Sequence, residues 1–294
     1  RLSNNLNLNQ PSPGPTSIAS RRPYFAVRPQ LADVSYALSD GLSNYNAFQL
    51  TVDKRMSQGL GVLAAYTWGH IIENVGNDYG GGYTPPQDIR NRNADRGNAG
   101  FDTRHRMTVA SLYHLPFGKG RHWLNRGGAA SFLLGGWQTN GIVSLRSGFP
   151  FNITQGGDLN TGGPVRPDRI ASGELDNPTR KLWFDPQAFR RVTCNIASRP
   201  DLCHFGSSGY NILEAPSQRN LDFSVFKNFP ITETIKVQFR TEFINAFNTP
   251  YFGQPGGIGF TTNDSLVPDG TRMGEVRGLR TPMRILQFGL KLYF

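Results

Sequence analysis

The stretch LQFGLKLYF, residues 286–294, decides the fold class of this sequence. Every second side chain in it is large and apolar. These positions are Leu286, Phe288, Leu290, Leu292 and Phe294. Strict alternation of this kind predicts a β-strand with one apolar face and one mixed or polar face.

The same period-two pattern recurs along the chain. It predicts strands at Tyr45–Lys54, Leu60–Trp68, Arg106–Leu115, Trp137–Leu145, Leu221–Phe226 and Ile235–Phe243, with a weaker one around Leu31–Leu38. With the final segment this makes about eight strands. The composition agrees, because 34 Gly and 20 Pro among 294 residues exclude helix bundles, coiled coils and βαβ enzymes.

The connections between these strands differ greatly in length. The links Arg55–Gly59 and Phe229–Glu233 are short, whereas Gly69–Asp102, Asn152–Arg219 and Asn248–Met283 are long. Outer-membrane barrels have short periplasmic turns and long outward loops, so this asymmetry favours an up-and-down transmembrane β-barrel. We therefore expect the long segments to face outward from the cell.

Aromatic side chains gather at both ends of the predicted strands. Trp137, Tyr113 and Tyr293 lie near the short turns, and Tyr45, Tyr66, Trp68, Phe149 and Phe151 lie near the long loops. Two aromatic belts are typical of the two interfaces of a membrane. The alternative is that these rings fill the core of a water-soluble β-sandwich.

Alternation also assigns side chains to the two faces of the barrel. The polar positions of the predicted strands would face a hydrated lumen, and the apolar positions would face lipid. The candidate lumen-facing residues are Gln49, Thr51, Gln238, Arg240 and Glu242. Contact with other parts of the protein or with water is their expected role.

The two cysteines, Cys194 and Cys203, lie in a stretch rich in Gly, Asn, Pro and Ser. A pair at this spacing in a loop fits a small disulfide in an oxidising compartment, and two free thiols are the alternative. Another long segment mixes Asp88, Asp95 and Asp102 with several arginines. This mixture predicts ion pairs within the loop, with a cation site as the alternative.

The sequence lacks the common catalytic motifs of enzymes. The sequence contains no G-x-S-x-G, P-loop or H-E-x-x-H motif, and its five His residues are not spaced as helical metal ligands. We expect no enzyme activity, no cofactor and no metal. The net charge of +10 is spread along the chain without a basic run or a nucleic-acid-binding motif, so nucleic acid is not an expected partner.

Twelve short motifs resemble the barrel region of one family. They are SNYNA (43–47), AYTW (65–68), FDTRHR (101–106), LPFGKG (115–120), LGGW (134–137), SGFPF (147–151), RPDR (166–169), WFDP (183–186), DFSVFKN (222–228), FINAFN (243–248), FGQP (252–255) and QFGLKLYF (287–294). In this order they resemble the C-terminal β-barrel portion of TonB-dependent outer-membrane receptors, in the Oar-like branch. The resemblance covers nearly the whole chain.

The resemblance implies a barrel of about 22 strands with a plug in its lumen. Residues 1–294 are then expected to be a fragment, the C-terminal portion, with the plug and the earlier strands absent. The ladder from Leu286 to Phe294 resembles the signal that barrel assembly machinery recognises at an exposed strand. The implied function is TonB-energised uptake of a scarce or bulky solute, such as a ferric siderophore, a corrinoid or an oligosaccharide, across the bacterial outer membrane.

Two other functions fit the same alternation. One is a self-contained small porin or adhesin, because about eight strands is a permitted number for an outer-membrane barrel. The other is a soluble secreted β-sandwich that binds carbohydrate. Partners common to the barrel readings are outer-membrane lipid and the assembly machinery, whereas TonB, a plug domain and an unknown solute belong to the receptor alone.

Overall fold

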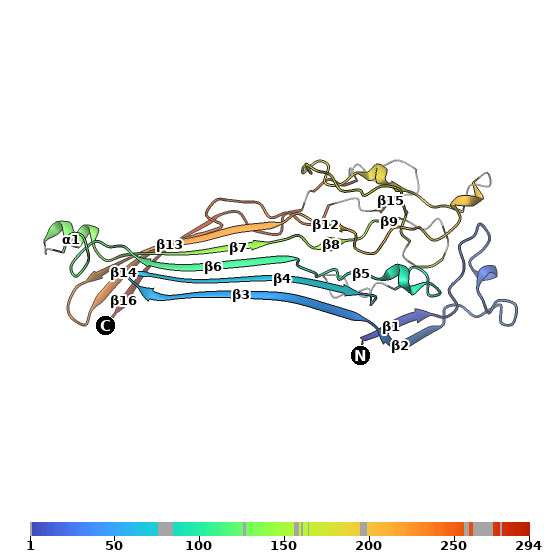
Figure 1. Cartoon of the computed structure of the whole chain (residues 1–294), viewed down its shortest axis with the longest axis horizontal. Helices are drawn as coiled ribbons and strands as arrows, with labels where there is room; N and C mark the ends of the chain where they lie inside the picture. The colour runs from blue at the N-terminus through green and yellow to red at the C-terminus, as the bar shows by residue number, and fades with distance from the viewer. Residues whose placement is uncertain are drawn as a thin grey trace.

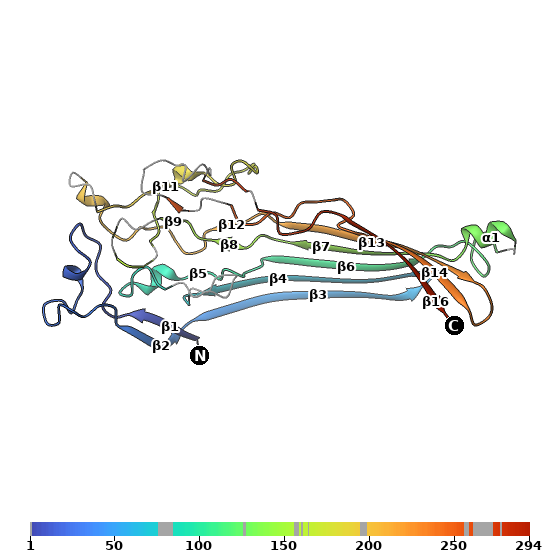
Figure 2. The same cartoon turned by 180° about the vertical axis from the view of Figure 1, so that it is seen from behind.

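A computed structural model of the chain describes residues 2–75, 85–125, 128–155, 159, 161–163, 165–194, 199–255, 259–260, 273–276 and 278–294. Long strands run side by side along the molecule, and most of the irregular segments gather at one end (Figure 1). Seen from behind, the helix α1 and the short turns again lie at the opposite end (Figure 2). The long connections of the sequence therefore lie at one end of the strands, and the short ones lie at the other end.

Seven long strands form the main sheet. They are β3 (Ser43–Ser57), β4 (Leu60–Glu73), β6 (His105–His114), β7 (Trp137–Arg146), β13 (Gln218–Pro230), β14 (Lys236–Ile244) and β16 (Ile285–Tyr293). Neighbours are antiparallel in the order β16-β14-β13-β7-β6-β4-β3, and the short β5 (Gly97–Asn98) extends the sheet beside β4. All seven were predicted from alternation, and the all-β antiparallel class is confirmed.

The connections at the short-turn end have different local structures. Gln58 and Gly59, between β3 and β4, both have positive φ, as a two-residue hairpin turn that matches the strand twist requires. In the β13–β14 turn the amide of Ile235 donates to the Thr232 hydroxyl at 2.9 Å. The link from β6 to β7 contains the six-residue helix α1 (Ala129–Leu134), which alternation did not predict.

The strand register brings the apolar positions of all seven strands to one side, here called the apolar face. One cross-strand row joins Leu50 to Tyr66, Tyr66 to Met107 and Met107 to Leu145. On the same face, toward the β16 edge of the sheet, Phe243 lies between Phe223 and Leu286. The opposite side of the sheet is here called the polar face.

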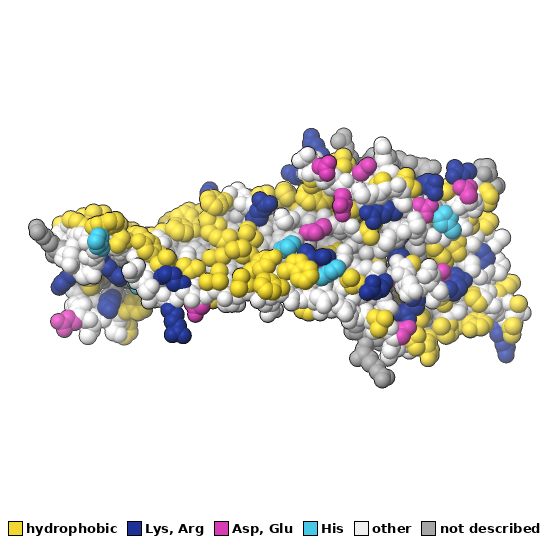
Figure 3. All heavy atoms as spheres, in the orientation of Figure 1, with side chains coloured by type: hydrophobic (Ala, Val, Ile, Leu, Met, Phe, Trp, Pro, Cys, Tyr) yellow, Lys and Arg dark blue, Asp and Glu magenta, His cyan; other side chains and the backbone are white. Residues whose placement is uncertain are grey.

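Much of the apolar face is exposed in the described chain. Phe288 is 69% exposed and Leu290 is 74% exposed. In the view of Figure 3, hydrophobic side chains form a band over the strands, and most charged side chains gather at the loop end. A folded water-soluble domain rarely leaves so large an apolar surface open.

The long segments fold into a compact region, here called the loop cap. Its short elements are β8 (Pro150–Phe151), β9 (Thr154–Gln155), β10 (Asp168–Arg169), β11 (Phe189–Arg190), β12 (Leu213–Glu214), β15 (Gly259–Phe260), η2 (Arg92–Asp95), η3 (Pro186–Ala188) and η4 (Pro200–Leu202). Ile153, Phe184 and Phe189 belong to one buried cluster, and Leu159 and Val192 to a second. The loop cap therefore has an apolar core of its own.

The weak strand expected around Leu31–Leu38 is present, but it begins later and lies outside the main sheet. The structure has β2 at Ser35–Gly41, paired with β1 (Leu2–Asn7) in a separate two-stranded sheet, with η1 (Ala19–Arg21) in the link between them. The side chain of Asn4 donates to Asp40 at 3.1 Å, and Asn7 accepts from the amide of Val34 at 3.0 Å. Polar side chains hold this hairpin, and Asn is depleted in strands, so hydrophobic alternation missed β1.

The sheet is open. Among the strands that the structure describes, β3 and β16 are its two edges and do not pair with each other. The described strands therefore form a wall with two free edges, and a closed barrel is not present in this chain as described.

Candidate functional site

The polar face carries the predicted lumen-facing residues of β14. Gln238 donates to the side chain of Asn228 at 2.9 Å, and a nitrogen of Arg240 lies 3.7 Å from a carboxylate oxygen of Glu242. The Arg240 guanidinium also stands 4.5 Å from the centre of the Phe226 ring. These contacts link β13 and β14 near the short-turn end and leave the row hydrophilic.

The other two lumen-facing candidates lie elsewhere on the same face. Gln49 and Thr51 are on β3, where they pair in register with Thr67 and Ala65 of β4. In the sheet order β3 is one edge and β14 is next to the other. The structure therefore places the five candidates on one face and does not bring them together into a single site.

Two arginines that the sequence analysis did not single out stand next to each other on the polar face. Arg106 of β6 and Arg146 of β7 are a cross-strand pair at the loop-cap end. Arg146 donates to the Tyr251 hydroxyl at 2.8 Å, and its guanidinium lies 4.4 Å from the Phe149 ring centre. Strand register, which brings residues 40 positions apart together, was the information needed to find them.

Adjacent positive charges on a sheet repel each other unless an anion or a ring offsets them. The pair lines a groove of ≈ 180 Å³ with Thr108, Ser144 and Gln218. Hydroxyl, amide and guanidinium donors in one groove suit an anionic or oxygen-rich group. The groove also includes the apolar side chains of Met107 and Leu145.

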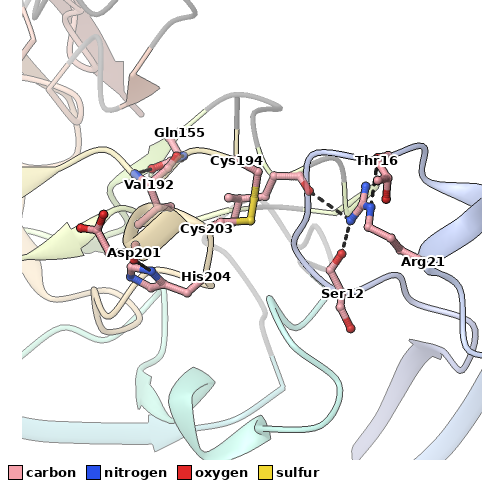
Figure 4. The surroundings of a disulfide bond; sticks show 10 residues. Ser12, Thr16, Arg21, Gln155, Val192, Cys194, Asp201, Cys203 and His204 are labelled. Atoms are coloured by element: carbon pink, nitrogen blue, oxygen red, sulfur yellow. Dashed lines mark hydrogen bonds between the residues drawn. A yellow bond between two sulfur atoms is a disulfide. The ribbon is translucent and has the colours of Figure 1, made fainter. Parts of the chain in front are cut away.

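Cys194 and Cys203 form a disulfide in the loop cap (Figure 4). The labelled side chains around it come from distant segments, among them Arg21, which donates to the carbonyl of Thr16 at 3.1 Å. Gln155 bonds the backbone of Val192 in both directions, at 2.5 Å and 3.0 Å. The disulfide ring is therefore fixed beside the second buried cluster.

A buried carboxylate anchors the ring on its other side. Asp168 accepts from Nε2 of His204 at 3.0 Å, from the amide of Ser207 at 3.1 Å and from Arg190 at 3.1 Å. Desolvation alone would raise the pKa of Asp168, and the hydrogen bonds from His204, Ser207 and Arg190 more than offset it, so this pKa is lowered. The ionised carboxylate thus ties β10, β11 and the ring together.

Ion pairs within the loop cap are confirmed. Arg90 lies 2.9 Å from Asp88, and Arg104 lies 3.3 Å from Asp102. The third acid, Asp95, pairs with the distant Arg166 at 2.5 Å, and both side chains are buried. Arg166 also donates to the carbonyl of Ser208 at 2.8 Å. This buried pair joins two long connections, so the loop cap is one cross-braced unit.

The described residues contain neither a metal-site cluster nor a helix that could span a membrane. Within them, no group of three or more His, Cys, Asp or Glu side chains is arranged to hold a metal ion. In the same part of the chain, no helix has the length and apolar character needed to cross a bilayer.

The terminal ladder is exposed along its whole length. Leu286, Phe288, Leu290 and Leu292 project from the apolar face of β16, with β14 on one side. On its other side β16 has no partner strand among the residues described. Phe294 follows the strand and is 97% exposed.

A family model for an outer membrane beta barrel domain matches residues 1–287. The chain belongs to this family. The protein is accordingly one of the bacterial outer membrane, and its uncovered apolar face is the surface that meets lipid. Comparisons with curated proteins and with solved structures gave no match.

Proposed function

We propose that residues 1–294 are the C-terminal barrel portion of a TonB-dependent receptor of the Oar-like branch, which takes up a scarce or bulky solute. The open sheet carries this proposal, because β3 and β16 are both free to pair with further strands. An edge of fifteen residues, β3, is long enough to accept a full membrane-spanning strand. The order of the twelve family-like motifs supports the same assignment.

In this proposal each surface of the chain contacts a different partner. Lipid covers the apolar face, a plug domain fills the lumen against residues such as Arg240 and Glu242, and TonB acts on that plug. The barrel assembly machinery binds the ladder of β16. The chain performs no covalent chemistry, so it is a transporter segment and not an enzyme.

The arginine pair narrows the class of solute. Arg106 and Arg146 stand where the polar face meets the loop cap, so a solute that has passed the cap would meet them as it enters the lumen. Their guanidinium groups favour a solute with carboxylates or other anionic oxygens, as in many ferric siderophores, over a neutral oligosaccharide.

Uptake by the full-length receptor tests the proposal. Cells that express it should accumulate a radiolabelled ferric siderophore with carboxylate ligands, and deletion of TonB should abolish the accumulation. Arg146→Ala should lower uptake per inserted receptor, and Gln238→Ala, on the same face but near the short-turn end, should not. Uptake that continues without TonB would instead support a porin.

A further inference from the structure

The helix α1 is attached to the apolar face of the sheet. Its Phe132 ring lies 5.6 Å from the ring of Phe229, centre to centre. The indole nitrogen of Trp137 donates to the carbonyl of Leu133 at 3.2 Å. Phe229 and Trp137 both belong to the apolar face by register, because they share its rows with Val237 and Lys227. The helix therefore lies on the lipid side of the wall, at its short-turn end (Figures 1 and 2).

Lys227 is the charged residue that holds the helix there. It stands on the apolar face, paired in register with Trp137 and Phe239, and is only 3% exposed. Its ammonium donates to the carbonyl oxygens of Phe132 at 2.9 Å and Gly135 at 2.6 Å. These are carbonyls at the helix C-terminus, which have no partner within the helix and favour a cation.

The rings around Lys227 complete its surroundings. The ammonium lies 5.1 Å from the centre of the Trp137 ring system and 4.8 Å from that of Phe229. Together the lysine and the indole turn the polar backbone at the end of the helix toward the sheet. The carbonyl groups of Phe132, Leu133 and Gly135 at its C-terminal end thus have partners in the protein.

The outward side of the helix is apolar. Phe132, Leu133 and Leu134 are 52%, 61% and 54% exposed, and residues 129–134 contain no charged side chain. The helix packs on β7 and β13, which lie inside the sheet order and adjoin neither free edge. Strands added at either edge would therefore leave Phe132, Leu133 and Leu134 uncovered.

We propose that α1 is a membrane-interface anchor, whose Phe132, Leu133 and Leu134 side chains enter the boundary between phospholipid headgroups and acyl chains. Phospholipid is the occupant because the exposed trio is continuous with the apolar face that already meets lipid. Trp and Lys are the side chains that bridge apolar and wet surroundings at such a boundary. The helix adds apolar surface at the short-turn end of the barrel wall. It thereby sets the depth of this end of the wall in the membrane.

Lipid-borne quenchers test this location directly. A Leu133→Cys variant of the full-length protein, purified from outer membranes, is labelled with an environment-sensitive fluorophore. It is then placed in vesicles of phosphatidylethanolamine and phosphatidylglycerol that contain brominated phosphatidylcholine. We expect bromine near the headgroup to quench most of the fluorescence, and bromine near the chain end to quench less.

Two matched variants control for depth and for water. A label at Phe288→Cys, within the apolar face, should be quenched by the chain-end bromines. A label at Glu233→Cys, in the exposed β13–β14 turn at the same end, should be quenched by aqueous iodide alone. Iodide quenching without lipid quenching at position 133 would overturn the proposal, and so would protection from both quenchers, which means that a protein partner or a second copy covers the helix.

A third variant tests the role of Lys227 as a positioning residue. Lys227→Met keeps an apolar stem and removes the ammonium that binds the two carbonyls. We expect the label at 133 to lose its lipid quenching and become sensitive to iodide, with the label at 288 unchanged. If this variant does not insert, Trp137→Phe, which removes the bond to Leu133 and replaces the indole beside Lys227 with a smaller ring, should produce a smaller shift in the same direction. An unchanged depth at 133 in the variant that inserts would contradict the assignment.

Discussion

The strand wall exposes its apolar side chains, whereas the loop cap buries them. In the wall, Leu290 is 74% exposed, and neighbouring strands hold each other by backbone hydrogen bonds. In the cap, Phe184 is 1% exposed, inside a cluster with Phe151 and Phe189. A disulfide and the buried pair of Arg166 with Asp95 brace the cap further.

The difference shows which solvent each region is built for. The wall displays apolar side chains where water would oppose them, so it depends on lipid to be stable. The cap buries its apolar side chains as a water-soluble domain does and would keep its packing in water. Substitutions should therefore have opposite consequences in the two regions.

The largest effect is expected in the core of the cap. Phe184→Ala should destabilise the cap by about 3–5 kcal/mol, because it removes a fully buried ring and leaves a cavity. Hydrogen exchange of the Ile153 amide, measured in nanodiscs, should accelerate accordingly. Phe288→Ala, on the apolar face, should leave that exchange rate unchanged. Equal acceleration by both variants would show that the wall and the cap unfold as one cooperative unit, contrary to this account.

A charge on the apolar face should act on the wall alone. Leu290→Arg should cost about 2–4 kcal/mol if the side chain lies near the bilayer midplane. The amount of protein that inserts into lipid vesicles during refolding measures this cost. Lys236→Ala and Gln238→Ala, on the polar face, serve as controls and should insert normally. Equal loss in all three variants would favour a water-soluble core over a barrel wall.

Removal of the disulfide should loosen the cap and spare the wall. Cys194 and Cys203 are nine positions apart, and closing so short a loop contributes about 2–3 kcal/mol in the chain-entropy model. The double variant Cys194→Ala, Cys203→Ala should expose the cap to added protease in intact cells. Yield in the outer membrane should not change, and a loss of inserted protein would show that the cap and the wall fold together.

The smallest expected effect is a pH dependence of the cap. The lowered pKa of Asp168 means that its carboxylate stabilises the folded cap at pH values above the ordinary Asp pKa of about 4. This contribution is lost as the pH falls through the lower folded pKa. Asp168→Asn should therefore weaken protease resistance at pH 7 and narrow its difference from the unmodified protein at pH 3. An undiminished difference at pH 3 would contradict the ionised anchor.

The wall was readable from the sequence because a single property repeats in it. Alternation has a period of two, so the apolar positions of Ile235–Phe243 or Leu286–Phe294 identify a face without any knowledge of partners. Strand ends were less predictable. The segment expected at Leu221–Phe226 extends from Gln218 to Pro230, because the register with β7 and β14 continues past the apolar residues.

The cap and the groove were not readable in this way. Phe184 and Ile153 are 31 positions apart, and no local pattern predicts that they share a core. The same is true of Arg106 and Arg146, whose proximity depends on β6 and β7 pairing in one particular register. The helix α1 was missed because six residues are too few for a helical period to stand out.

The most direct test of the two-solvent account is a spin-label scan of β14 in vesicles, one residue at a time from Lys236 to Ile244. Collisions with oxygen report lipid, and collisions with a water-soluble nickel complex report the lumen. The account predicts oxygen maxima at Val237, Phe239, Thr241 and Phe243, and nickel maxima at Lys236, Gln238, Arg240 and Glu242. Profiles without this period of two, or oxygen maxima on the polar positions, would contradict it.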